Sequence, residues 1–260
     1  MPRTRYNHSV IGARQTTSAA AASGIFGLTD HQVLSGAGLF PKPELPSIPA
    51  SLIASSFWNT SGYSSAGAAV PVTIPTGTQV GDSVIIIQGF TGLDSNPSIT
   101  NKTGWTGTVY YNDTNYGYYG MIWRKLGIES GDLTGMTITP SATSSGNSFG
   151  TFAAITFRNL QTFNIQLNAT LPPGTSSFSA SGITKTGGSD FILSAVNDRS
   201  GGTLTAGAGW TKLGQTTALS SIFSLAVSYR ASASYTSLDT IPWSRDVTTY
   251  TIGNWTIDAI

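Results

Sequence analysis

Few side chains in this 260-residue chain could carry out acid–base or nucleophilic chemistry. The only two histidines are His8 and His31, and the chain has no cysteine. Both histidines precede the part of the sequence that has strand-like patterns. A Ser-His-Asp relay or a histidine-rich metal site therefore cannot form within that part, and thiol catalysis is excluded.

Carboxylates are the remaining candidates, because glycosidases need two of them at a defined separation. Four carboxylates, Glu129, Asp132, Asp190 and Asp239, lie beside Gly, Ser or Thr at expected turns or strand ends. We interpret them as solvated turn formers. The sequence therefore predicts a protein that is not an enzyme and that has no catalytic residues, metal or cofactor.

Two segments could supply oxygen ligands to Ca²⁺, namely Asp94-Ser95-Asn96 and Asn197-Asp198, which occupy corresponding expected loops. Asx-turns explain these residues better, because Asn and Asp side chains readily bond to the nearby backbone of a loop. The chain has neither an EF-hand spacing nor a phosphate-binding glycine loop.

Six Trp and ten Tyr residues could stack on sugar rings. Trp105 and Trp210 each follow a glycine and precede a threonine, and we interpret both as core residues of two similar halves. The segment Tyr110–Tyr119 resembles a hairpin tip, and loops often carry binding residues. Receptor contact or a subunit interface and cross-strand packing both remain open for its tyrosines, chiefly Tyr111, Tyr116, Tyr118 and Tyr119.

The charge content indicates which partners to expect. Only 10% of residues are charged, and 13 Lys and Arg oppose 12 Asp and Glu, so no basic face for nucleic acid is expected. No run of 18 apolar residues and no secretory leader is present, so membrane insertion is not expected. Low charge favours residence in an assembly or outside a cell.

Alternating and continuous apolar runs separated by glycine-rich turns predict strands throughout residues 51–260. The run Val84–Ile87 is typical of a strand that is buried on both faces. Four landmarks recur in the same order about 100 to 108 residues later, which indicates an internal duplication with halves at about 51–160 and 161–260. The pairs are Asp82 and Asp190, Gly104-Trp105-Thr106 and Gly209-Trp210-Thr211, Trp123-Arg124 and Tyr229-Arg230, and Phe152–Leu160 and Ile252–Ile260.

A half with four or five strands cannot cover both faces of its own sheet. We therefore expect an all-β protein whose two halves pack face to face as one jelly-roll-like sandwich of roughly 8–10 strands.

Residues 1–50 differ from the rest and are expected to form an extended N-terminal anchoring arm with one short helix at about Asp30–Ser35. Four prolines in residues 41–49 favour a semi-rigid spacer. The apolar residues of the arm have too few neighbours to bury one another, so we expect them to dock onto another chain. They are Ile25, Phe26, Leu28, Val33, Leu34, Leu39 and Phe40.

Several motifs resemble those of bacteriophage (cyanophage-type) virion structural proteins that have an N-terminal adaptor peptide and a duplicated jelly-roll-like β-sandwich. The adaptor-like segment is Ala20–Pro41, and the resemblance of the sandwich covers about residues 55–260. Its signature is Val80–Ile86, Gly104-Trp105-Thr106, Trp123-Arg124-Lys125 and Ala153–Leu160. The resemblance implies a tail, fibre, baseplate or capsid-surface role and implies no catalytic residues.

The expected function is therefore a tail- or fibre-type virion component that docks onto other virion proteins through its arm. It would project the sandwich as a homo-oligomer, with a trimer favoured, and could contact a host-surface glycan. Two alternatives remain open: a capsid decoration or cement protein, and a free carbohydrate-binding module or polysaccharide-degrading enzyme.

Overall fold

The computed structural model describes residues 50–63, 69–91, 97–113, 118–139, 148–168, 176–184, 191–198, 201–218, 223–231, 237–246 and 251–259. All of them belong to one compact unit, Pro49–Ile260. The expected arm, with its helix at Asp30–Ser35, lies outside the described residues except for Ala50. The described part is all-β, as predicted, and its only helical segment is the 3-10 turn η1 (Ser130–Asp132). No helix among the described residues is long and apolar enough to cross a membrane.

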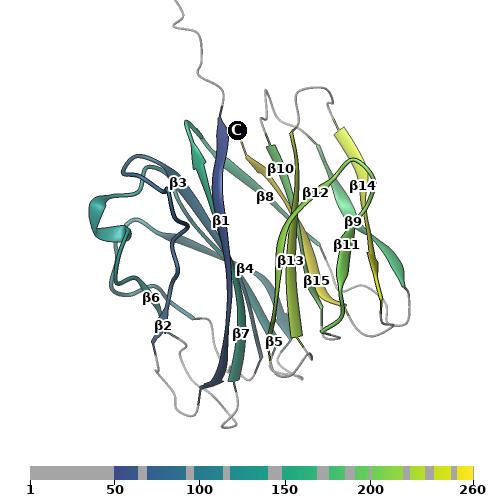
Figure 1. Cartoon of the computed structure of the whole chain (residues 1–260), viewed down its shortest axis with the longest axis horizontal. Helices are drawn as coiled ribbons and strands as arrows, with labels where there is room; N and C mark the ends of the chain where they lie inside the picture. Colours follow the sequence, from purple (N-terminus) through teal and green to yellow (C-terminus); the bar gives the residue numbers. More distant parts are fainter. Residues whose placement is uncertain are drawn as a thin grey trace, which may run out of the picture. The chain divides into compact units, whose positions relative to one another are not determined.

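The first half contains a five-stranded antiparallel sheet, which is drawn in blue to teal in Figure 1. Its central strand carries the apolar run that the sequence identified as doubly buried. In spatial order the strands are β1 (Ser51–Tyr63), β7 (Ser148–Arg158), β3 (Ser83–Thr91), β5 (Tyr118–Lys125) and β4 (Thr106–Asp113).

The second half contains another five-stranded antiparallel sheet. In spatial order its strands are β12 (Thr211–Ala218), β13 (Phe223–Ala231), β10 (Phe191–Asp198), β15 (Thr251–Ala259) and β8 (Phe163–Asn168). Each half also has a smaller outer sheet. The first pairs β2 (Val70–Pro71) with β6 (Thr137–Ile138), and the second has the order β11 (Leu204–Ala206), β14 (Ser237–Arg245) and β9 (Ser177–Thr184).

The two halves have the same topology. Reading the second large sheet backwards matches β1 with β8, β7 with β15, β3 with β10, β5 with β13 and β4 with β12. The outer layers also correspond. β6 pairs with β2, and Thr139, directly after β6, forms a bridge with Ser98, just as β14 pairs with β9 and with β11. The duplication that was predicted from the sequence is therefore present in the connectivity of the chain.

Pairing registers correct two of the predicted sequence equivalences. In the closing strands, Ala153 lies opposite Ile87 and Trp255 lies opposite Ala195, so the repeat of Phe152–Leu160 begins at Asn254 and not at Ile252.

In the aromatic-Arg strands the shift is one residue. Ile87 lies opposite Ile122, and Ala195 lies opposite Val227, and all four residues face the core between the large sheets. Ile122 is therefore the counterpart of Val227, and the equivalence of Trp123-Arg124 with Tyr229-Arg230 is wrong by one residue. A slip of one residue matters, because it moves every side chain of a strand to the opposite face.

The corrected register pairs Arg124 with Tyr229 and Lys125 with Arg230. Two glycines with positive φ support it independently, namely Gly104 at 78° and Gly209 at 80°. A Cβ atom on Gly104 would lie 3.2 Å from Lys125 Cε, and one on Gly209 would lie 3.6 Å from the guanidinium carbon of Arg230. The two Gly-Trp-Thr turns therefore contact equivalent basic residues, and Trp105 and Trp210 occupy equivalent positions.

The large sheets are buried on both faces. Val84, Ile85, Ile86 and Ile87 all have 0% exposure, which confirms the prediction for this run. Ile85 and Ile87 belong to a core that also contains Leu193 and other residues of the second half, so the two large sheets pack face to face as predicted. We call this cluster the shared core.

The opposite faces of the large sheets pack against the outer layers. Val84 and Ile86 contact the layer that contains Ile138, while Ile192 and Trp243 belong to the corresponding cluster of the second half. The sequence did not predict these outer layers. The structure shows instead that each half covers its own outer face and that the halves cover each other's inner faces.

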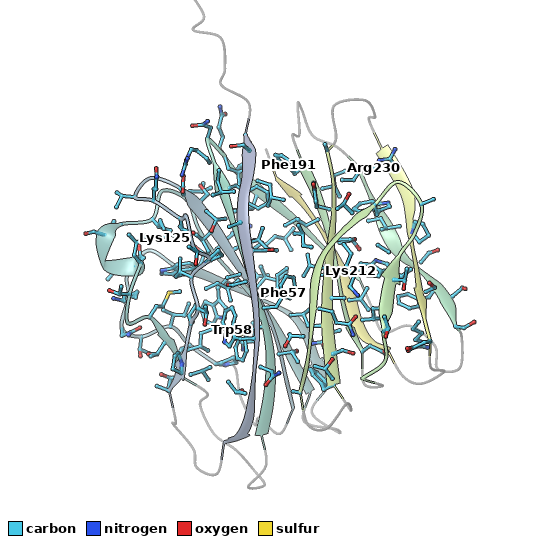
Figure 2. The ribbon with its side chains drawn as sticks, in the orientation of Figure 1. Phe57, Trp58, Lys125, Phe191, Lys212 and Arg230 are labelled. Atoms are coloured by element: carbon cyan, nitrogen blue, oxygen red, sulfur yellow. The ribbon has the colours of Figure 1, made fainter. Side chains whose placement is uncertain are left out.

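The halves approach one another closely at glycine positions. A Cβ on Gly214 in β12 would lie 2.5 Å from Phe57 Cε2 in β1, and a Cβ on Gly89 in β3 would overlap the buried amide of Asn197 in β10. Figure 2 shows Phe57 at the junction of the two large sheets. Asn59 on β1 also donates a 2.7 Å hydrogen bond to the backbone carbonyl of Thr217 on β12. Packing and hydrogen bonding therefore join the two halves directly.

Candidate functional site

The tyrosine-rich segment is a hairpin, as predicted. β4 and β5 pair continuously as far as Asp113 opposite Tyr118. Tyr116 lies outside the described residues, and so do the side chains of Tyr111, Tyr118 and Tyr119. Their contact with a receptor or another subunit remains a prediction. The same holds for the docking residues of the arm, which also lie outside the described residues: Ile25, Phe26, Leu28, Val33, Leu34, Leu39 and Phe40.

Trp105 and Trp210 are both partly buried and pack against the outer cluster of their own half. The indole Nε1–H of Trp105 donates a 3.0 Å hydrogen bond to Asp132 Oδ1. The tryptophans at the other described core positions bond in a similar way, because Trp123 Nε1 donates to Gln88 Oε1 and Trp243 Nε1 donates to Ser194 Oγ. The bond of Trp243 links β14 of the outer layer to β10 of the large sheet, whereas the bond of Trp123 joins the neighbouring strands β5 and β3 within one sheet.

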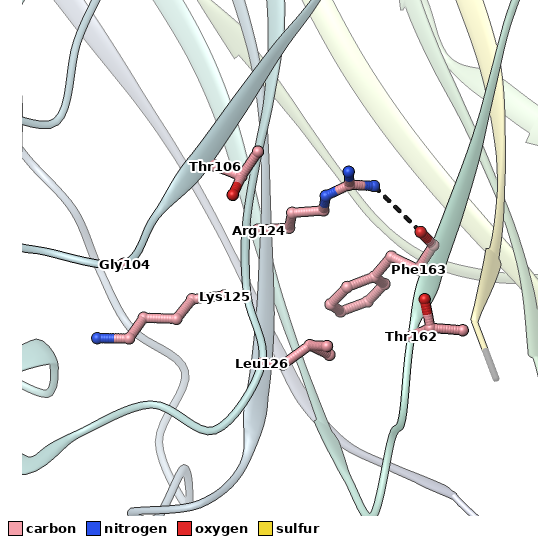
Figure 3. A pocket seen from close by; sticks show the side chains of 7 residues that line it. All are labelled: Gly104, Thr106, Arg124, Lys125, Leu126, Thr162 and Phe163. Atoms are coloured by element: carbon pink, nitrogen blue, oxygen red, sulfur yellow. Dashed lines mark hydrogen bonds between the residues drawn. The ribbon is translucent and has the colours of Figure 1, made fainter.

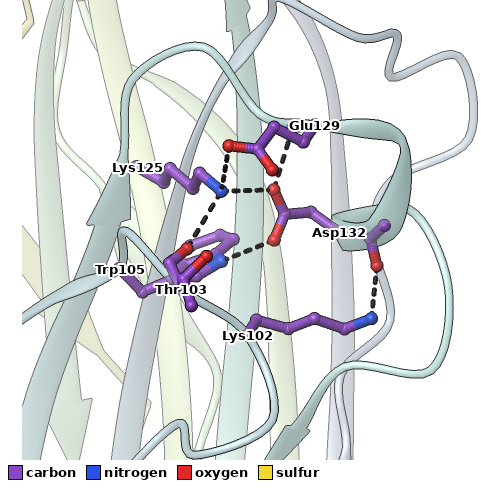
Figure 4. A network of polar contacts seen from close by, with 7 residues as sticks. Lys102, Thr103, Trp105, Lys125, Glu129 and Asp132 are labelled. Carbon is purple, nitrogen blue, oxygen red and sulfur yellow. Dashed lines mark hydrogen bonds and ion pairs between the residues drawn. The ribbon is translucent and has the colours of Figure 1, made fainter.

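Asp132 is the centre of a polar network beside the Gly-Trp-Thr turn of the first half (Figure 4). Lys125 Nζ lies 2.7 Å from Asp132 Oδ2 and donates to the Thr103 carbonyl at 3.0 Å. The backbone N–H of Glu129 also donates to Asp132 Oδ2, at 2.8 Å. Asp132 is only 2% exposed, so the prediction that it is a solvated turn former is wrong, whereas the Glu129 side chain is 74% exposed.

Several donors around Asp132 stabilise its ionised form. Burial alone would raise the pKa of this carboxyl, but hydrogen bonds from Lys125, the Glu129 backbone and Trp105 together hold it below its usual value. A buried, fully hydrogen-bonded carboxylate of this kind is suited to fixing a turn and is a poor proton donor at neutral pH.

Asp82 joins the start of β3 to the end of β7. Its two carboxylate oxygens accept hydrogen bonds from Arg158 Nε at 2.8 Å and from Arg158 Nη2 at 2.9 Å, and the Gln79 backbone donates to the same group at 2.8 Å. The bond from Arg158 is the main reason that the pKa of Asp82 is lowered. This bidentate pair is a strong and directional interaction.

The segment Asn197-Asp198 is not a loop. Both residues belong to the end of β10 and are almost fully buried, so the prediction of an Asx-turn or calcium loop is wrong here. Asp198 Oδ1 pairs with Arg245 Nη1 at 2.9 Å, and both side chains have 0% exposure. The guanidinium carbon of Arg245 lies 5.5 Å from the centre of the Phe178 ring. The pair therefore connects the large sheet of the second half to its outer layer.

The other acidic residues considered from the sequence remain predictions. Asp94-Ser95-Asn96 and Asp190 lie outside the described residues, and so does the side chain of Asp239. In the described part of the chain, no three His, Cys, Asp or Glu side chains form a group that could hold a metal ion.

A pocket of about 340 Å³ lies where the large sheet of the first half meets the start of β8 (Figure 3). The side chain of Arg124 on β5 extends toward β8, and its Nη1 donates a 3.0 Å hydrogen bond to the Phe163 carbonyl. In the sequence Arg124 belongs to a landmark of the repeat and to a motif of the resemblance, and neither predicts this pocket. The lining residues are Gly104, Thr106, Arg124, Lys125, Leu126, Thr162 and Phe163.

The described geometry therefore has two distinct parts. The carboxylates of Asp82, Asp132 and Asp198 each pair with a basic residue and hold strands together. The pocket is lined by the guanidinium of Arg124 and the hydroxyl groups of Thr106 and Thr162, which could contact a ligand from solution. No family model matches the chain, and no curated protein or solved structure matches it significantly.

Proposed function

We propose that this chain is a non-enzymatic structural protein of a bacteriophage virion. In this proposal residues 1–50 dock onto other virion proteins, and the β-sandwich projects from the particle as a tail- or fibre-type component. The projecting parts assemble as a homo-oligomer, for which a trimer is favoured, and the tyrosine hairpin contacts the host or a neighbouring subunit.

The observation that carries this proposal is the shared core between two topologically equal halves. The sequence resemblance to virion proteins implies a duplicated sandwich, and the described residues form one. The motifs that carry the resemblance supply strands, turns and ion pairs of the scaffold. Val84–Ile86 lies in the central strand, the Gly-Trp-Thr turn supports Lys125, and Arg158 pairs with Asp82.

The charged residues give a second line of support. Asp82, Asp132 and Asp198 are buried and each pairs with a basic side chain, which favours a role in connecting strands over a role in acid–base catalysis. With only 10% charged residues the chain is also suited to permanent residence in an assembly, where neighbouring subunits cover part of its surface.

Deletion of residues 1–45 tests the docking role of the arm. We expect the fragment 46–260 to fold, because the shared core and both outer cores lie within it. Quantitative mass spectrometry of purified particles measures its copy number. This number should fall by about tenfold or more relative to the full chain, because a loss of about 1.4 kcal/mol in docking free energy already lowers the binding constant tenfold.

A matched pair of variants separates apolar docking from arm length. Ile25→Ser, Phe26→Ser and Leu28→Ser together should reduce incorporation, whereas Gln15→Ala, Thr16→Ala and Thr17→Ala together should not. Normal incorporation of the truncated chain would refute the docking role, and absence of the full chain from particles would refute the virion assignment. Copies in proportion to the capsid subunits would instead assign the chain as a decoration protein.

A further inference from the structure

Arg124 occupies a position where the duplication predicts an uncharged residue. It lies two residues after Ile122 on β5, so both side chains are on the face that packs toward the second half. Its counterpart in the second half is Tyr229, which packs against the shared core with its ring centre 6.2 Å from that of Phe191. The first half therefore places a cation where the second half places an aromatic ring, and departures from a local packing pattern are typical of functional sites.

The partners of Arg124 leave most of its hydrogen-bonding capacity for a ligand. Lys125, Arg158 and Arg245 each contact a carboxylate, whereas Arg124 donates to the neutral carbonyl of Phe163. A guanidinium carries five N–H donors in a planar fork that matches a carboxylate. In Figure 3 the head group of Arg124 lies among the residues that line the pocket.

The rest of the lining combines hydroxyl groups with one exposed apolar side chain. Thr106 and Thr162 provide hydroxyls, and Leu126 is one of only two large apolar side chains that are clearly exposed among the described residues, at 46%. The lining contains no carboxylate. The ammonium of Lys125 is held by Asp132, so the charge that faces a ligand comes from Arg124.

We propose that this pocket binds the carboxylate of an acidic saccharide unit of the uronic acid type. Arg124 contacts the carboxylate, the threonine hydroxyls bond to ring hydroxyls, and Leu126 covers an apolar C–H face of the ring. A volume of about 340 Å³ is small for a ligand site and fits one or two sugar units. An acidic peptide would need further pockets for its side chains, and this lining offers none. The inference does not depend on where the protein works.

Calorimetric titration of the full chain with galacturonic acid oligosaccharides tests the proposal. The wild-type chain should bind them, and Arg124→Gln should weaken binding by about tenfold or more because a charged, bidentate contact is lost. Arg124→Lys should give an intermediate affinity, since the charge remains but the planar fork does not. Thr162→Val, which lies outside the strands, should weaken binding several-fold.

Arg230→Gln is the matched control, because it removes the same charge from the second half at the counterpart of Lys125. Its affinity should stay within about twofold of the wild type. Neutral galactose oligosaccharides of equal length should bind about tenfold more weakly than the acidic ones. Thermal unfolding of each variant confirms that it is folded.

Three results would overturn the assignment. They are no measurable binding of the acidic oligosaccharide by the wild-type chain, equal affinity of the wild-type and Arg124→Gln chains, and a preference for acidic peptides over acidic saccharides. Loss of arm-dependent incorporation into particles would leave the saccharide result unchanged, so the two proposals fail independently.

Discussion

Replacement of Asp198 with asparagine is expected to lower the free energy of unfolding by about 3–5 kcal/mol. Asp198 and Arg245 are both fully buried and lie 2.9 Å apart. Without the carboxylate, the guanidinium of Arg245 stays fully buried and loses the opposite charge that Asp198 supplies, which costs more than the loss of one hydrogen bond. Urea denaturation followed by tryptophan fluorescence measures the change, with the m-value as a check on the two-state assumption.

Two further variants identify the physical cause. Asp198→Leu combined with Arg245→Met removes both charges and should recover most of the lost stability, because buried ion pairs cost much desolvation energy themselves. Glu129→Gln breaks the exposed pair with Lys125 and should cost less than about 1 kcal/mol. A cost of Asp198→Asn no greater than that of Glu129→Gln would contradict the buried-pair interpretation.

Phe157→Ala is expected to destabilise the chain by about 3–5 kcal/mol as well, through a cavity at the junction of the halves. Phe157 is fully buried in the shared core, with ring centres 6.1 Å from Phe163 and 5.6 Å from Phe191. Both neighbours belong to the second half. The variant should therefore destabilise the two halves together in a single shifted transition.

Differential scanning calorimetry measures this effect directly. Val80→Ala is the control, because Val80 is 61% exposed, and it should change stability by no more than about 0.5 kcal/mol. A Phe157→Ala chain in which the first half melts early while the second half keeps its original transition would contradict a shared core.

The sequence predicted the fold class, the duplication and the doubly buried run Val84–Ile87, because these features depend on the pattern of apolar residues along the chain. It did not predict the outer layers. β2 and β6 have two residues each, so no periodic pattern can mark them, and their burial depends on packing against the large sheet. An aromatic-Arg pattern predicts the wrong register between the repeats. The correct register follows from which side chains of each strand face the shared core.

The roles of the charged residues were less predictable. Asp132 and Asp198 have the neighbours of turn residues, but their burial is decided by Lys125 and by Arg245, which is 47 positions away from Asp198 in the chain. The pocket could not be predicted either, because it forms only where β5 meets the start of β8. A long-range contact of this kind has no signature in a single sequence.

The packing gives the described part of the chain a continuous framework. Each large sheet is covered on one side by a small outer layer and on the other by its duplicate, so the second half completes the core of the first. Hairpins and turns at the sheet edges are then held by a rigid support, which is where binding residues are usually found.

Hydrogen exchange of the full chain, followed by mass spectrometry, tests most directly whether the two halves form one cooperative scaffold. Amides of the central strands β3 and β10 should exchange only through global unfolding, with the same free energy in both halves. Exchange of β10 at a clearly lower free energy, while β3 stays protected, would show that the second half opens alone and would contradict the shared core.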